Sequence, residues 1–121
     1  MDETTFPLSA TAARAGRSFV QAFCRANGVS PAIEDDAVLI TSELIGNSYL
    51  HARSPTRLRL GCQGQLLRVE VADNSDSQPV LGRGAPADND GRGVLIMDTL
   101  AQRWGVRPQA RGKVVWFELA M

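Results

Sequence analysis

The chain is poor in the residues that build metal, redox and disulfide chemistry, with two cysteines and one histidine in 121 residues. Cys24 and Cys62 are far apart and follow no metal or redox spacing, so we expect both thiols to be reduced. No apolar run approaches the roughly 18 residues that a membrane-spanning helix needs. The acidic N-terminus lacks the basic and apolar regions of a signal peptide. These absences predict a cytoplasmic protein.

Neither sign of charge is in excess. Thirteen Lys and Arg residues balance thirteen Asp and Glu residues, which gives no indication of a surface for nucleic acid or for an anionic membrane. A hydrophobic content of 44% with 21% charged residues is typical of a globular protein. A chain of this length has room for one hydrophobic core, so we expect a single domain over residues 1–121.

The periodicity of the apolar residues predicts an α+β fold. One layer of three helices is expected to cover one face of a mixed, mostly antiparallel sheet, in a two-layer α/β sandwich. Residues 77–92 show no periodicity, and unstructured stretches of this length are usually lids or disordered segments. The predicted helices are 9–27, 30–51 and 91–101, and the predicted strands are 4–8, 56–62, 67–72, 104–106 and 114–119.

The longest predicted helix carries polar residues in an unusual place. Asp36, Glu43 and Asn47 fall on one line along the helix, and that line runs between apolar residues on both sides. A half-buried carboxylate and amide need a partner. A carboxylate one turn before an amide oxygen can activate a hydroxyl or a water beside a hard cation. Taken alone, the pair is equally compatible with a plain polar helix edge.

Two further positions suit a nucleotide. Asp73 ends a predicted strand, where a carboxylate can accept hydrogen bonds from the exocyclic amine of a purine; it also suits an ordinary turn. Gly91-Arg92-Gly93 opens a predicted helix, and backbone N–H groups at a helix start bind phosphate. Glycines also simply end loops, so each position alone leaves both interpretations open.

In this order, Glu43-x-x-x-Asn47, Asp73 and Gly91-x-Gly93 resemble the N, G1 and G2 boxes of the GHKL ATPase superfamily. Within it the chain resembles the short, single-domain anti-sigma-factor serine/threonine kinases of the RsbW/SpoIIAB type. The resemblance implies a Bergerat fold that holds ATP under a mobile lid. The segments that carry it are 13–20, 42–52, 71–73, 91–97, 101–105 and 112–117.

The resemblance implies a role for each position. Glu43 would be the general base, Asn47 would bind the Mg²⁺ that bridges the phosphates, and Asp73 would hold the adenine amine. His51 matches a histidine common after the asparagine and either contacts the nucleotide or packs at the helix end. The phosphates would lie against residues Gly91, Arg92, Gly93 and Val94.

The chain departs from the family pattern at two places on the adenine side. Asp73 is followed by Asn74-Ser75, where the family usually has Asp-x-Gly, and the added side chain lies where backbone passes the purine. Val114 stands where the family often has a threonine whose hydroxyl lies near the adenine. We therefore expect nucleotide binding with a weaker or less base-selective adenine pocket.

The resemblance implies an enzyme that transfers the γ-phosphoryl group of ATP to a serine or threonine of a STAS-domain anti-sigma-factor antagonist. The alternative is a binding module that sequesters a sigma factor, with ATP as a conformational ligand and little turnover. A third interpretation is a scaffold whose pocket no longer binds nucleotide. Because members of the family are commonly homodimers through the first strand and helix, residues 4–25 are the expected self-association surface.

Overall fold

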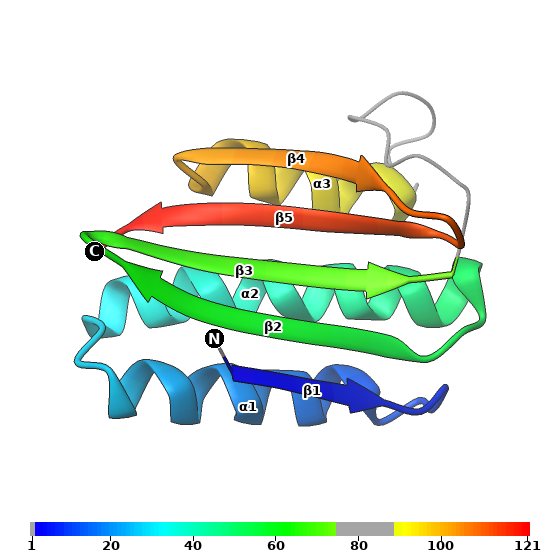
Figure 1. The fold of residues 1–121 in the computed structure, drawn as a ribbon, viewed down its shortest axis with the longest axis horizontal. Helices are drawn as coiled ribbons and strands as arrows, with labels where there is room; N and C mark the ends of the chain where they lie inside the picture. Colours follow the sequence, from blue (N-terminus) through cyan, green and yellow to red (C-terminus); the bar gives the residue numbers. More distant parts are fainter. Residues whose placement is uncertain (1, 75–88) are drawn as a thin grey trace.

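A five-stranded sheet and a layer of helices form the two layers of the protein (Figure 1). The computed structural model describes residues 2–74 and 89–121, without the side chains of residues 51, 52 and 89–92. The strand order is β1-β2-β3-β5-β4, and every described pair of neighbouring strands is antiparallel. The expected α+β sandwich is confirmed. The elements are β1 (Asp2–Phe6), α1 (Ala12–Ala26), α2 (Pro31–Asn47), η1 (Ser48–Ala52), β2 (Thr56–Gln63), β3 (Leu66–Asp73), α3 (Asn89–Leu100), β4 (Arg103–Pro108) and β5 (Lys113–Ala120).

The alternation along the strands separates the two faces of the sheet. Leu60, Val69 and Phe117 lie opposite one another in the register of β2, β3 and β5, and each is fully buried against the helices. Burying a side chain of this size stabilises the fold by about 1.5–3 kcal/mol. The intervening residues, such as Arg59 and Arg68, lie on the other face, which none of the described helices covers (Figure 1). We call this uncovered side the open face.

Helices α1 and α2 approach each other closely at Gly16. A Cβ atom at this position would overlap the Cδ1 atom of Ile45, so the present packing of Ile45 against α1 depends on the missing side chain of Gly16. Cys24 is buried in the same region, and this burial raises the pKa of its thiol to about 11. Cys24 and Cys62 are both free cysteines, as expected.

The ends of the helices differ in detail from the sequence-based expectation. Pro31 follows Ser30 at the start of α2, as predicted. The regular helix ends at Asn47, and the last turn of the expected helix is the π-helical η1, which closes on Arg53 in the left-handed region with φ of 52°. Helix α3 begins at Asn89, within the stretch that was expected to be a loop.

Two strands are also shifted. Strand β1 begins at Asp2 and ends before Pro7, two residues earlier than predicted, since proline has no N–H for the sheet. Strand β5 begins at Lys113, one residue earlier than predicted, and so includes the residue that pairs with Asp73. Within the part of the chain that the structure describes, no helix is long and apolar enough to cross a membrane.

Candidate functional site

Helix α3 meets α2 at the polar line of α2. Gly93 is buried, and a Cβ atom built on it would lie 2.9 Å from Asn47 Nδ2 and 3.4 Å from Glu43 Cβ. Residues that are far apart in the sequence therefore come together, as the box pattern predicted. The absence of a side chain at Gly93 lets the α3 backbone approach the Asn47 amide and the Cβ atom of Glu43 on α2.

Glu43 and Asn47 lie at the boundary between core and solvent. Both side chains are part-buried, whereas Leu44 and Ile45 between them are buried in the core. The core residues fix the rotation of α2 and hold the two polar groups toward α3. A carboxylate and an amide oxygen held this way can take a proton and ligate a cation.

The residues predicted to bind phosphate lie in the first turns of α3. The side chain of Val94 is 1% exposed and belongs to the hydrophobic core, where it anchors α3. Its backbone, rather than its side chain, is the part available to a phosphate. Gly91 and Arg92 belong to α3 and His51 to η1 by their backbones, but their surroundings lie outside the described part of the chain.

Asp73, at the end of β3, is held from two sides. Ser48 Oγ donates a hydrogen bond of 2.7 Å to Asp73 Oδ2. The Lys113 ammonium lies 3.2 Å from Oδ1 and 3.3 Å from Oδ2 of the same carboxylate. The side chain of Asp73 is 6% exposed and that of Lys113 is 12% exposed, so this is a largely buried ion pair. Such a pair fixes the carboxylate where an approaching base would meet it.

The register corrects the interpretation of Val114. Val114 lies opposite Ala72, on the open face, whereas Lys113 lies opposite Asp73 on the helix side. The residue that faces Asp73 in this register is the lysine. The group at this position is therefore an ammonium, and a hydroxyl reaches Asp73 from Ser48 in η1.

The turn before β5 also brings backbone against Asp73. Gly112 has a φ of +92°, and a Cβ atom there would overlap the carbonyl oxygen of Asp73. On the other side, the backbone N–H of Asn74 donates a hydrogen bond of 3.1 Å to Ser54 Oγ. The end of β3 is thus fixed by both neighbouring segments up to Asn74. Ser75, the other residue that departs from the family pattern, lies outside the described residues.

Sequence reasoning missed Ser48 and Lys113. Ser48 directly follows Asn47, and a hydroxyl next to a predicted ligand was a usable signal. It becomes the first residue of a π-helical turn, which widens the helix where it meets β3 and closes through a 3.0 Å hydrogen bond from the Arg53 N–H to the Ser48 carbonyl. Such turns occur frequently at functional sites.

The donor set suits Mg²⁺ bound together with a nucleotide. In such sites Mg²⁺ takes one or two protein oxygens and completes its shell with phosphate oxygens and waters. The Asn47 amide, whose Nδ2 lies against Gly93, carries one such oxygen. In the described residues no group of three or more His, Cys, Asp or Glu side chains offers a metal site built from protein alone.

The chain was compared with known proteins. Residues 6–119 match the model of the histidine kinase-like ATPase domain (HATPase_c_2). A comparison with curated proteins found no match. Since the matched residues include nearly the whole sheet, all three helices and the contact of Glu43 and Asn47 with Gly93, the chain belongs to the histidine kinase-like ATPase domain family of ATP-binding proteins.

Proposed function

We propose that the protein is an ATP-dependent serine/threonine kinase of the anti-sigma-factor type, acting on a STAS-domain antagonist. The observation that carries the proposal is the position of Glu43 one turn before Asn47, with both residues against Gly93 of α3. A domain that only binds ATP needs the asparagine and the glycine but has no need of a carboxylate beside them. A kinase uses that carboxylate as a base.

The described residues divide the work of phosphoryl transfer between them. When bound, Mg²⁺ neutralises charge on the phosphates, and the Asn47 amide oxygen would hold it. Glu43 takes the proton from the attacking serine or threonine hydroxyl as its oxygen bonds to the γ-phosphorus and ADP leaves. Transfer of this kind depends mainly on positioning and charge stabilisation, so few protein groups suffice.

At the other end of the site, Asp73 and Lys113 would receive the base. The Asp73 carboxylate accepts a hydrogen bond from the exocyclic amine of adenine, and the Lys113 ammonium donates to the neighbouring ring nitrogen. Ser48 and Gly112 hold the carboxylate in place from η1 and from the β4–β5 turn. The ion pair supports base recognition by a donor and an acceptor side by side.

The assay is phosphoryl transfer from [γ-³²P]ATP to candidate STAS-domain proteins. We expect label on a serine or threonine of the partner with the wild-type protein, and at least a hundredfold slower labelling with Glu43→Gln. Binding of Mg-ATP by Glu43→Gln, measured by thermal shift, should remain within about threefold of the wild type. Transfer that survives in Glu43→Gln would contradict the assigned base.

The second candidate is a nucleotide-dependent module that sequesters a sigma factor with little turnover. The observation that favours it is the Lys113 ammonium on Asp73, which occupies acceptors that the base would use. Copurification of a sigma factor without any label transfer would select this function. A protein with no thermal shift in Mg-ATP or Mg-ADP would instead be a scaffold, because ligand at 100 times its Kd adds about 2.7 kcal/mol.

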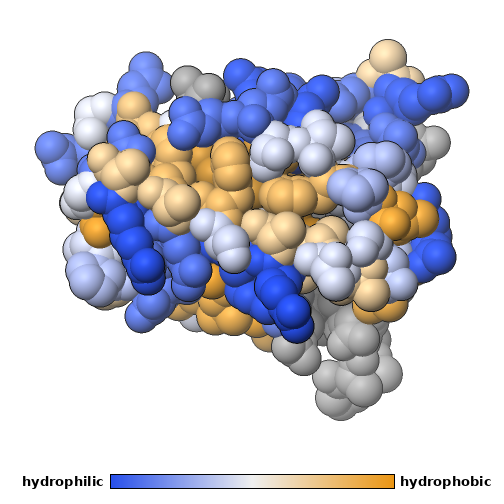
Figure 2. Space-filling view, turned by 90° about the horizontal axis from the view of Figure 1, so that it is seen from below, coloured by the Kyte–Doolittle hydropathy of each residue, from blue (hydrophilic) through white to orange (hydrophobic). Residues whose placement is uncertain are grey.

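Self-association through residues 4–25 is part of the proposal. Strand β1 pairs only with β2 and so is an edge strand, and Figure 2 shows an apolar band on the side of the molecule that carries β1 and α1. Phe6, Ala13 and Phe19 are part-buried apolar residues of these two elements. Light scattering should give a dimer for the wild type and a monomer for Phe19→Asp. A monomeric wild type at micromolar concentration would contradict the dimer.

A further inference from the structure

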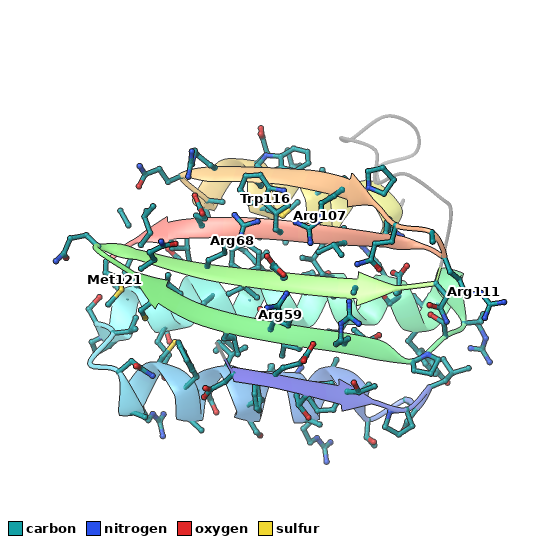
Figure 3. The ribbon with its side chains drawn as sticks, in the orientation of Figure 1. Arg59, Arg68, Arg107, Arg111, Trp116 and Met121 are labelled. Atoms are coloured by element: carbon teal, nitrogen blue, oxygen red, sulfur yellow. The ribbon has the colours of Figure 1, made fainter. Side chains whose placement is uncertain are left out.

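The open face of the sheet carries a ladder of arginine and glutamate side chains that reaches all five strands (Figure 3). Residues of opposite charge on neighbouring strands lie beside one another in the register, so the ion pairs continue from β1 across to β4. The ion pairs are Glu3 with Arg57 (3.3 Å) and Arg59 (3.8 Å), Arg59 with Glu70 (3.3 Å), Arg68 with Glu70 (3.0 Å) and Glu118 (3.0 Å), and Arg103 with Glu118.

The two central carboxylates of the ladder, Glu70 and Glu118, are nearly buried and fully engaged by arginines. The side chains of Glu70 and Glu118 are 9% and 8% exposed, and each is bound by two arginines. Burial alone would raise the pKa of Glu118, but the hydrogen bonds and charges of Arg103 and Arg68 outweigh burial and lower that pKa. The arginines are more exposed and have five donors each. The outward-facing donors of this surface are therefore cationic.

Trp116 makes the middle of the ladder rigid. The guanidinium of Arg68 stacks on the Trp116 ring at 4.3 Å from its centroid. The indole covers Gly105, where a Cβ atom would lie 2.9 Å from the ring. Arginine and tryptophan held in this way are the residue types that dominate binding energy at protein interfaces.

One row of the open face contains arginines and no carboxylate. In the strand register Arg57, Ala72, Val114 and Arg107 follow one another across β2, β3, β5 and β4. A hollow of about 170 Å³ lies at the Arg57 end of this row, beside Ala72, and its lining includes neither Val114 nor Arg107. It is lined by Thr5, Pro55, Arg57, Ala72, Asp73, Asn74 and Gln109.

Described carboxylates compensate little of the positive charge of Arg57 and Arg107 in this row. Arg107 is exposed and makes no ion pair with any described residue, and Arg57 is 44% exposed with one pair to the half-exposed Glu3. Asp73 borders the hollow, but its carboxylate is held by Ser48 and Lys113 on the helix side of the sheet. The row is therefore cationic, in contrast to the two balanced rows that follow it along the strands.

We propose that this row is a docking site for an extended acidic segment of a partner protein. Arg57 and Arg107 stand three strand spacings apart, about 14 Å, which corresponds to about four residues of extended chain. Two carboxylates at that separation would each meet a guanidinium, the pairing that allows two parallel hydrogen bonds. The segment between them would lie over Ala72 and Val114.

The surrounding charges favour a protein segment over a nucleic acid. Glu3 and Glu70 lie in the next row and Glu118 in the row after it, where arginines bind them. The uncompensated positive charge is therefore confined to one row, which suits one short segment better than a continuous phosphate backbone. The net charge of the chain is also zero. The docking row and the Asp73 carboxylate lie on opposite faces of β3, so the partner and a nucleotide bind without competing for space.

The test measures binding of fluorescein-labelled hexaglutamate by anisotropy at low ionic strength. We expect Arg57→Gln/Arg107→Gln to bind at least fivefold more weakly than the wild type. The control is Arg14→Gln/Arg25→Gln, which removes the same charge from exposed positions of α1 and should bind within twofold of the wild type. Thermal unfolding confirms that each variant folds, and the single variant Arg107→Glu should abolish binding by itself.

Three outcomes would overturn the proposal. Equal weakening in both double variants would mean that only net charge matters. An oligothymidylate of equal charge that binds more tightly than hexaglutamate would assign the face to nucleic acid. Amide NMR shifts that leave Ala72 and Val114 unmoved during the hexaglutamate titration, or no binding at all, would place the acidic segment elsewhere or nowhere.

Discussion

Lys113 and Asp73 face each other across β5 and β3, with the lysine ammonium 3.2 Å and 3.3 Å from the two carboxylate oxygens. The side chains are 12% and 6% exposed, so solvent screens the pair only weakly. Removing either partner takes away the close counter-charge of a buried group, which costs more than the pair itself contributes. The ion pair itself therefore adds little to stability, but the loss of either Lys113 or Asp73 alone would destabilise this end of the site.

A double-mutant cycle measures this coupling. We expect Lys113→Met and Asp73→Asn each to lower the free energy of unfolding by about 1–3 kcal/mol. The double variant should lose at least 1 kcal/mol less than the sum of the two. Urea unfolding at pH 7 gives the four values. Losses that add within about 0.5 kcal/mol would show that the two groups act independently.

Gly93→Ala tests whether the close contact between α3 and Asn47 serves nucleotide binding rather than stability. Alanine is a better helix former than glycine by about 0.5–1 kcal/mol, and this gain offsets the crowding of Asn47. We expect the unfolding free energy to change by less than about 1 kcal/mol. Because the new Cβ would lie 2.9 Å from Asn47 Nδ2, the amide must move, and Mg-ATP affinity should fall at least tenfold.

Gly46→Ala is the matched control for this change. Gly46 also lies in a helix close to Asn47, but a Cβ atom there meets nothing within 4 Å. The substitution should raise stability by about 0.5–1 kcal/mol and leave Mg-ATP affinity unchanged. If Gly93→Ala also leaves the affinity unchanged in calorimetry, the contact between α2 and α3 has no role in binding.

The sequence predicted the parts of the site that depend on local spacing. Glu43 and Asn47 share a helix face by periodicity alone, and Gly93 was joined to them by the order of the boxes. Lys113 could not be placed in this way, since its position opposite Asp73 depends on the register between β3 and β5, which the period of each strand does not fix. That register brings Lys113, rather than Val114, to the Asp73 carboxylate.

The extent of the helices depended on contacts that the sequence does not show. The apolar spacing predicted one helix to His51, but the last turn opens into η1, where Ser48 bonds to Asp73 on another element. The arginine ladder was equally hidden. Its residues read as plain polar positions of alternating strands, and only the register brings Arg59, Glu70 and Trp116 into one row.

Glu118→Gln tests the ladder through pH. The pKa of Glu118 in the folded protein lies below its ordinary value of 4.5 because of Arg103 and Arg68. A depressed pKa contributes stability that is complete above the unfolded value and is lost as pH falls through the folded value. The variant should therefore be less stable than the wild type by about 1–3 kcal/mol at pH 7.

The difference should shrink below about pH 4.5 and vanish in more acid solution, as the wild-type carboxyl becomes protonated. Urea unfolding over pH 3–7 gives the profile. Glu3→Gln is the control, because that side chain is 48% exposed and its pairs are screened by water, so a change within about 0.5 kcal/mol is expected. A difference for Glu118→Gln that is constant with pH would assign its role to packing.

Thr41→Val tests an unsatisfied group in the core between α1 and α2. Thr41 is fully buried, and its Oγ1 atom has no hydrogen-bond partner among the described residues. A hydroxyl removed from water without a partner costs about 1–3 kcal/mol, and valine replaces it with a methyl group of similar size. We expect the unfolding free energy to rise by about 1 kcal/mol and the melting temperature to rise by about 3–6 °C.

The matched variant is Thr41→Ser, which keeps the hydroxyl and removes the methyl group. It should lower stability by about 1 kcal/mol, because Thr41 Cγ2 fills space beside Gly16, 4.0 Å from where a Cβ would stand. If valine destabilises the protein while serine does not, the hydroxyl has a partner in solution. Since Thr41 faces α1 rather than α3, neither change should alter Mg-ATP affinity. An altered affinity would mean that the α1–α2 contact sets the position of Glu43 and Asn47.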